Sequence, residues 1–312
     1  MTTRSLIKFG KNSFAVTLPQ NWIKKQGLIK GDSLFFEENN RGLVISSDNK
    51  TNKKQIKKID IDVTEKDISR IRREIIANYI NGYDVIRLKG EDIDKKSKDI
   101  RSVVHTLVAL EVLEQTSKQI IARIFLLSQT TFIPQLIRKI DILNRNMMED
   151  LGLKDANYDD ILQRDQDIDR LTFLILRLIK SNLQDTSANR ENNLSNLKLL
   201  DYWNVAYLLE SIADEVRKLS VALKETSKDK KIFKDIIELY TSLVNCYKDT
   251  MDAYHSNNVE KAYSLSILKK DIADNCDKLY QKYWHKKGAV IALERIRDTA
   301  FLIHNIGRRT YS

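Results

Sequence analysis

From residue 132 onwards, the apolar residues of this chain recur with the period of an α-helix almost without interruption. Polar breaks divide this stretch into six predicted helices, and they lie near residues 152–157, 186–193, 226–230, 256–258 and 286–288. Proline and glycine are scarce, at 2 and 9 of 312 residues, which favours long helices over the turn-rich chains of β-sandwiches and barrels. The sequence therefore predicts a mainly α protein built on helical bundles.

One of these helices carries an apolar seam that is typical of a bundle. The seam residues follow one another at spacings of three and four, and are Leu209, Ile212, Val216, Leu219 and Leu223. The motif Leu-Glu-x-Ile-x-Asp begins at residue 209 and occurs again at residue 293. A duplication within a six-helix region indicates two three-helix bundles. Because the leucine of each copy is a seam position, the Glu and Asp are expected on the outer face of the bundle.

The outer-face carboxylates form pairs four residues apart, Glu210 with Asp214 and Glu294 with Asp298. Like charges at this spacing repel by roughly 0.2–0.5 kcal/mol on a bare helix, whereas a shared hard cation reverses that effect. The spacing alone is weak evidence, since 43 acidic residues give roughly six such pairs by chance. Both acidic pairs are flanked by apolar residues at the same spacing, and this repetition favours metal binding. A solvated acidic face is the alternative.

The N-terminal part of the chain differs from the rest in charge. Residues 1–60 contain twelve Lys or Arg and five Asp or Glu, a net charge of +7, out of +10 for the whole chain. Such a concentration of cations suits nucleic acid first and an anionic membrane surface second. Solubility alone is the third interpretation.

The same region shows the two-residue period of β-strands. Strands are predicted at residues 4–9, 13–18, 33–38 and 42–46, with a short helical stretch between Pro19 and Gly27. About 46 residues bury too little apolar surface to be stable alone, and this stretch contains no cysteine. Dimerisation is therefore expected.

Three segments of this region resemble the AbrB/SpoVT family of swapped-hairpin DNA-binding domains. They are Gly10-Lys11-Asn12-Ser13, Val16-Thr17-Leu18-Pro19 and Gly27-Leu28-Ile29-Lys30-Gly31-Asp32, with Trp22 and Gln26 between the last two. The resemblance implies a β-barrel formed by two interleaved chains, hence a homodimer that binds double-stranded DNA. The implied DNA contacts are Arg4, Lys8 and Lys11, followed by Lys24, Lys25 and Arg41. Many relatives carry Arg where this chain has Lys11, and Lys lacks the fork that reads guanine, so phosphate contacts are expected.

A small α/β domain is predicted between the N-terminal domain and the helical bundles. Residues 50–58 are typical of a polar linker, after which Thr64 is expected to cap a helix that runs to about residue 82, with Val63 packed on Ile68. A strand at 85–88, a helix at 96–113 and a strand or helix at 120–126 follow. The predicted domains are residues 1–48, 49–130 and 131–312.

The last 180 residues resemble the PhoU family, whose two three-helix bundles carry E/D-x-x-x-D motifs. The copies here are Glu210 to Asp214 and Glu294 to Asp298, and Asp165 with Asp169 match a further acidic box. The resemblance implies that these carboxylates bind a divalent metal, namely iron, zinc or magnesium. Two departures from the family pattern weaken this implication, most of all in the second bundle: Glu215 follows Asp214, and Thr299 follows Asp298. In the second bundle, three residues could correspond to Asp165, namely Asp271, Asp274 and Asp277.

The two resemblances together match the phosphate-uptake regulators common in archaea. They imply a dimeric, cytoplasmic transcription regulator whose body senses phosphate status through metal or a partner protein, such as a component of a phosphate transporter. The alternative is a signalling adaptor that docks on a phosphate transporter or histidine kinase and uses its head to dimerise. An enzyme is not expected, because the sequence offers neither a His-rich ligand set nor an activated nucleophile. Membrane insertion is not expected either, since no apolar run approaches ~18 residues.

Overall fold

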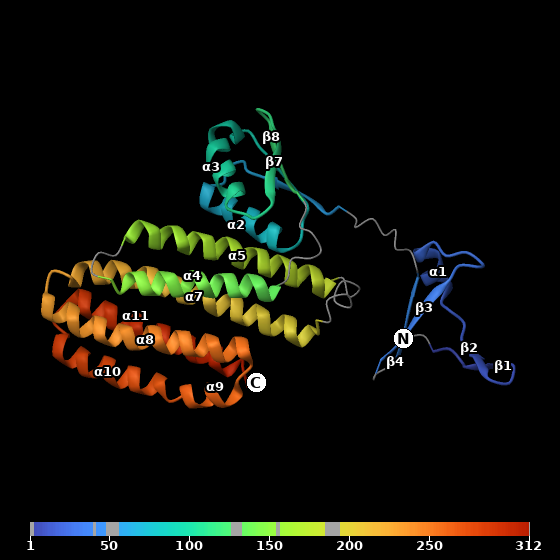
Figure 1. Cartoon of the computed structure of the whole chain (residues 1–312). Coiled ribbons are helices and arrows are strands. Elements are labelled where there is room, and N and C mark those ends of the chain that lie inside the picture. The colour runs from blue at the N-terminus through green and yellow to red at the C-terminus, as the bar shows by residue number, and fades with distance from the viewer. Residues whose placement is uncertain are drawn as a thin grey trace. The chain divides into compact units, whose positions relative to one another are not determined.

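The computed structural model describes residues 3–39, 42–47, 56–125, 133–153, 157–184 and 194–311. The chain divides into two compact units, Met1–Gln55 and Ile56–Ser312, which are described separately below (Figure 1). Most of the described residues of the second unit are helical, so the predicted mainly α class is confirmed. No helix in the described ranges is long and apolar enough to cross a membrane.

The first unit, called the head below, has the predicted order of two strands, a helix and two strands. These elements are β1 (Ile7–Phe9), β2 (Ser13–Ala15), α1 (Gln20–Gln26), β3 (Leu34–Asn39) and β4 (Gly42–Ser47). β1 pairs with β2 and β3 with β4, both antiparallel, in two separate sheets. The first two strands are shorter than predicted, with three residues each. Pro19 precedes α1, and Gly27 ends it in the left-handed conformation that glycine adopts without strain, with φ of +66°.

The second unit begins with an α/β domain, called the connecting domain below. Its elements are β5 (Lys58–Asp62), α2 (Ile68–Ile80), β6 (Val85–Lys89), α3 (Ile93–His105), β7 (Leu110–Gln115) and β8 (Gln119–Ile124). The strands form one sheet in the order β5-β6-β8-β7, in which β5 and β6 are parallel and the other pairs antiparallel. Apolar residues from the sheet and both helices form one hydrophobic cluster.

Two predictions for the connecting domain are wrong. Thr64 does not cap α2; Asp67 does, because its side chain accepts a hydrogen bond from the backbone N–H of Arg70 at 2.7 Å. The helix predicted at 96–113 ends at His105, and Ala109 turns the chain with a positive φ of 62°. Residues 110–115 then form β7, since they pair antiparallel with β8, with a register shift between Val112 and Glu114. The stretch at 120–126, left open between strand and helix, is a strand as far as Ile124.

The rest of the second unit is helical and is called the body below. Its helices are α4 (Ile133–Leu151), α5 (Tyr158–Gln184), α7 (Asn196–Thr226), α8 (Lys230–Ser256), α9 (Val259–Leu265), α10 (Leu268–Tyr283) and α11 (Lys287–Arg308). These are seven helices in the described ranges, where six were expected, because the stretch after Asn258 breaks again at Ser266 and Ile267.

The helices of the body pack in two groups around one hydrophobic cluster. α4, α5 and α7 contact one another, α8 and α11 contact α10, and α7 and α11 share the most extensive helix–helix contact (Figure 1). The predicted seam residues are all buried, and they are Leu209, Ile212, Val216, Leu219 and Leu223. The corresponding residues of the second motif copy are buried at the same spacing, and they are Leu293, Ile296, Ala300 and Ile303.

Arg177 of α5 joins the body to the connecting domain. Its guanidinium donates to the backbone carbonyls of Tyr79 at 2.7 Å and Tyr83 at 2.9 Å, and pairs with the carboxylate of Asp84 at 3.0 Å. The Arg177 side chain is 6% exposed, so these contacts replace its hydration. α5 is thus the helix that carries the connecting domain.

Candidate functional site

The predicted DNA contacts of the head lie at exposed positions. Lys8 is on β1, Lys11 is in the turn between β1 and β2, and Lys24 and Lys25 are in the last turn of α1. These four residues and Arg4 are exposed, and none forms an ion pair with a carboxylate in the described part of the chain. Their charges are therefore available to an external polyanion. The sixth predicted contact, Arg41, lies outside the described residues.

The head buries none of its described side chains within a single chain. Phe9, Phe14 and Ile29 are 73%, 63% and 76% exposed. A two-stranded sheet is marginal alone, and two separate hairpins present apolar surface without a core. This surface needs another surface to cover it.

The structure brings the predicted acidic residues of the first bundle together. Asp165 and Asp169 lie on α5, Glu210 and Asp214 lie on α7, and the two helices pack against each other. Burial, with the charges of Asp169 and Asp214, raises the pKa of Glu210 to about 7. Burial and the charge of Asp165 raise the pKa of Asp169 to about 6. These four residues are called the acidic cluster below.

Two carboxylates of the acidic cluster are already paired with cations of the same chain. Nε of Arg217 lies 2.9 Å from Asp165, and Nη2 of Arg217 lies 2.6 Å from Asp214. Lys218 adds a second contact to Asp214 at 3.3 Å. Although burial raises it, hydrogen bonds and charges from Arg217 and Lys218 hold the pKa of Asp214 below its usual value. Arg217 thus bridges α5 and α7 through this pair of carboxylates.

The second motif copy has a different environment. Glu294 and Asp298 are exposed on α11, and Arg295 lies between them in sequence. Nη1 of Arg295 is 2.9 Å from Glu215 on α7 and 3.5 Å from Asp298. Of the three residues that competed as the counterpart of Asp165, Asp277 contacts α11, through an ion pair with Arg297. Asp271 and Asp274 are exposed.

The acidic side chains do not fit a preformed metal centre. In the described ranges, no group of three or more His, Cys, Asp or Glu side chains is placed to hold one metal ion. Arg217 and Arg295 supply positive charge at the positions where the family resemblance implies a metal. Metal binding at Asp165, Asp169, Glu210, Asp214, Glu294 and Asp298 stays a prediction.

The sequence interpretation missed both arginines. Arg217 follows Asp214 by three residues, and Arg295 precedes Asp298 by three, so each could have been found as a cation on the same helix face as the carboxylate. The spacing of residues along the chain does not indicate that either arginine contacts a carboxylate on the neighbouring helix. Cys246 and Cys276 are buried free thiols, and burial raises the pKa of each to about 11.

Comparison with known proteins identifies one part of the chain. Residues 7–55 match a family model described as antidote-toxin recognition MazE, bacterial antitoxin. No curated protein and no solved structure matches the chain. The matched segment covers β1 to β4, the same elements that present unpaired cations and uncovered apolar side chains. It supports an N-terminal DNA-binding domain of the AbrB type.

Proposed function

We propose that this chain is a DNA-binding transcriptional regulator of phosphate uptake. The observation that carries the DNA-binding part is the set of exposed, unpaired cations on a head that matches an antitoxin family model. Cations of this kind bind phosphates and displace counterions, which provides affinity at any sequence. The phosphate role rests on the resemblance of the body to the PhoU family.

The head acts as a homodimer in this proposal. The apolar side chains that a single chain leaves exposed, among them Phe9 and Phe14, are covered by the hairpins of a second copy. A dimer also places two heads at a fixed separation, so that the complex fits two half-sites on one duplex.

The body senses phosphate status through a metal or a partner protein. α5 carries Asp165 and Asp169 of the acidic cluster and, further along, Arg177, which holds the connecting domain. Arg72 of α2 is close enough to lower the pKa of Asp169. A change of charge at the acidic cluster would therefore act on α2, and through the connecting domain on the chain that leads to the head. No reaction is assigned to this assembly.

The adaptor is the second candidate, because one surface of the body favours a protein partner. Leu197, Leu200 and Tyr207 of α7 are 80%, 57% and 61% exposed. Their spacings of three and seven place them along one side of the helix. An exposed apolar stripe of this kind is suited to a helix of another protein, such as a component of a phosphate transporter.

The salt dependence of DNA affinity tests the role of the head. We expect the double variant Lys8→Ala, Lys11→Ala to reduce the slope of log K against log salt by about one for each phosphate that the head no longer binds. The control is Lys139→Ala, Lys228→Ala, which removes the same charge from exposed positions of the body that form no ion pair among the described residues. A slope that changes equally in both double variants would remove Lys8 and Lys11 from the contact surface.

A further inference from the structure

Lysines are concentrated in two turns that lie at the same end of the body, at the left in Figure 1. Residues 224–231 span the end of α7 and the start of α8, and residues 282–287 span the end of α10 and the start of α11. Together these segments contain seven lysines and two acidic residues, a net charge of +5 out of +10 for the whole chain. The two segments are called the basic end below.

Contacts between the helices hold the two segments side by side. A Cβ built on Gly288, the second residue of α11, would lie 3.1 Å from the carboxylate carbon of Glu225 on α7. Nζ of Lys282 lies 2.6 Å from a carboxylate oxygen of Asp235 on α8, and the hydroxyl of Tyr283 donates a hydrogen bond to the same oxygen at 2.5 Å. The basic end is therefore one surface formed by four helix termini.

Most of the positive charge of this surface is not neutralised within the chain. Five of its lysines are exposed and form no ion pair among the described residues, and they are Lys228, Lys230, Lys231, Lys286 and Lys287. The carboxylate of Asp229 caps α8, where it accepts hydrogen bonds from the backbone N–H groups of Lys231 and Ile232.

The neighbouring start of α5 carries two acidic residues. It lies beside the end of α7, since Nζ of Lys224 is 5.4 Å from the centre of the Tyr158 ring. Asp159 and Asp160 are exposed there, and neither pairs with a lysine of the basic end in the described ranges. Their charges offset part of the positive charge and leave an excess of lysines.

Two aromatic side chains are exposed beside these lysines. Trp284, at the end of α10, is 68% exposed, and Tyr280, one turn earlier, is 46% exposed. Their spacing of four places them on one side of the helix. Trp203 of α7, in contrast, packs against the hydrophobic cluster of the body. Tryptophan is highly buried on average, so an indole this exposed next to unpaired lysines indicates a surface that meets an amphipathic partner.

We propose that the basic end docks on the headgroups of an anionic phospholipid bilayer. Tryptophan and tyrosine are enriched where hydrocarbon meets water, because the ring and its polar N–H or O–H both find a suitable environment there. Lysines attract anionic headgroups, and each one near the surface contributes about fivefold in affinity. The two segments contain lysine and no arginine, and a point charge without a fixed fork suits mobile headgroups.

Duplex DNA is another polyanion that suits the lysines. Its phosphates would bind them but would leave the Trp284 ring without a partner, because the faces of paired bases are stacked inside the duplex. A bilayer accounts for both the charge and the exposed rings. This docking is independent of DNA binding by the head and of the acidic cluster.

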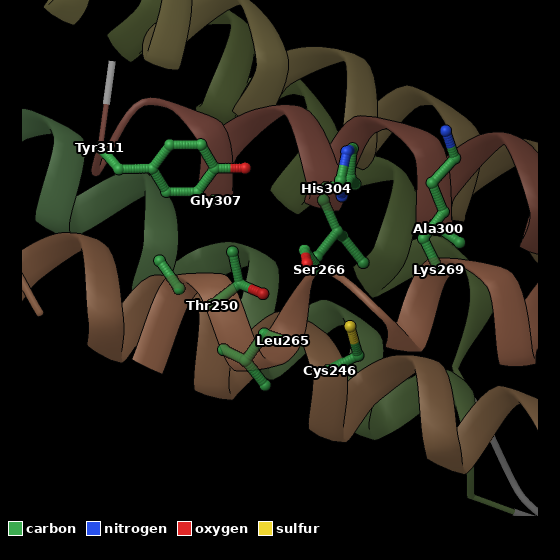
Figure 2. Close-up of a pocket in the computed structure, with 11 residues that line it drawn as sticks. Cys246, Thr250, Leu265, Ser266, Lys269, Ala300, His304, Gly307 and Tyr311 are labelled. Carbon is green, nitrogen blue, oxygen red and sulfur yellow. The ribbon is translucent and has the colours of Figure 1, made fainter. Parts of the chain in front are cut away.

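The basic end is also distinct from the pocket drawn in Figure 2. That pocket lies farther along α11, between Ala300 and Gly307, and no lysine of the basic end lines it. A bilayer needs an open surface and no cavity, so the position of the pocket does not limit the docking.

Co-sedimentation of the full chain with lipid vesicles tests the proposal. One set of vesicles contains phosphatidylcholine alone, and the other contains phosphatidylcholine mixed with an equal amount of phosphatidylglycerol. We expect binding to the mixed vesicles that weakens as salt rises, and none to the neutral ones. Absence of binding to the mixed vesicles would overturn the proposal.

Charge variants assign the binding to this surface. The double variant Lys230→Gln, Lys287→Gln should weaken binding to mixed vesicles on the order of 25-fold. The matched control is Lys98→Gln, Lys139→Gln, which removes the same charge from exposed positions of α3 and α4 that form no ion pair among the described residues. Equal losses in both double variants would contradict the assignment. Loss of vesicle binding in Lys8→Gln, Lys11→Gln, with none in the Lys230 and Lys287 variant, would assign it to the head instead.

Tryptophan fluorescence provides a readout that charge alone would not change. The emission of the full chain should shift to shorter wavelength with mixed vesicles, and the shift should be lost in Trp284→Phe, which keeps Trp22 and Trp203. A shift of the same size in Trp284→Phe would place the contact elsewhere. If the Lys230 and Lys287 variant weakens DNA binding and leaves vesicle binding unchanged, the basic end binds DNA and the proposal is wrong.

Discussion

The head and the second unit differ in where their apolar side chains lie. The described head leaves Phe9, Phe14 and Phe36 at least 60% exposed and buries no residue. The second unit contains two hydrophobic clusters, one in the connecting domain and one in the body. One part of the chain therefore has the cores needed to fold by itself. The described head has no such core, and in the proposed dimer a second copy supplies the missing contacts. Stability of the head should depend on protein concentration, and stability of the body should not.

The largest expected effect comes from an apolar residue of the head. If a second copy covers Phe14, then Phe14→Ala should cost about 3–5 kcal/mol for each protomer and dissociate the dimer. The matched control is Leu197→Ala in the body, an exposed apolar residue whose truncation should change stability by less than about 0.5 kcal/mol. Sedimentation equilibrium and calorimetry at two concentrations measure both. If the Phe14 variant is as stable as the Leu197 variant and dimerises equally well, then a second copy does not cover Phe14, and head and body do not differ in this respect.

The next largest expected effect is a dependence of the stability of the body on pH. The pKa of Glu210 is raised to about 7 and that of Asp169 to about 6, whereas carboxyls of an unfolded chain titrate near pH 4. The folded body holds these protons more tightly, so this contribution to stability is complete below about pH 4 and is lost as the pH rises through 6 and 7.

The double variant Asp169→Asn, Glu210→Gln should remove this dependence. Relative to the natural sequence, it should gain on the order of 1–2 kcal/mol at pH 8 and little at pH 4.5, once solvent screening is allowed for. Urea unfolding of residues 56–312 at the two pH values measures the difference. Equal effects at both would show that the acidic cluster does not titrate in this range.

The smallest expected effect concerns metal binding. Arg217→Gln frees Asp165 and leaves Asp214 paired with Lys218 alone, so the acidic cluster should bind Mn²⁺ several-fold more tightly than in the natural chain. Arg295→Gln in the second copy should change Mn²⁺ affinity less, because Glu294 and Asp298 are exposed. Titration followed by electron paramagnetic resonance gives both affinities. Unchanged Mn²⁺ binding in the Arg217 variant would leave the acidic cluster as a set of structural ion pairs.

The elements that could be predicted from sequence are those with a strong local pattern. The seam from Leu209 to Leu223 and the order of elements in the head follow from periodicity and from turn residues such as Gly27. Residues 110–115 were misassigned because their strand is defined by pairing with β8, an interaction between segments that local propensity does not record.

The acidic cluster shows the same limit for functional residues. The repeated motif identified Glu210 and Asp214, and the family resemblance implied Asp165 and Asp169. The packing of α5 on α7 brings these four residues together. The position of Arg217 between two of them depends on how the helices are rotated against each other. The sequence alone therefore identified the carboxylates but not the cation that pairs with them.

DNA binding by the full chain and by residues 56–312 tests the central claim most directly. Fluorescence anisotropy with promoter duplexes at several salt concentrations should show binding by the full chain that weakens as salt rises. The shorter chain keeps both hydrophobic clusters and should stay folded, yet it should not bind. Equal binding by both chains would contradict the account, because DNA binding would then not depend on the head. No binding by either chain would contradict the account and favour the adaptor.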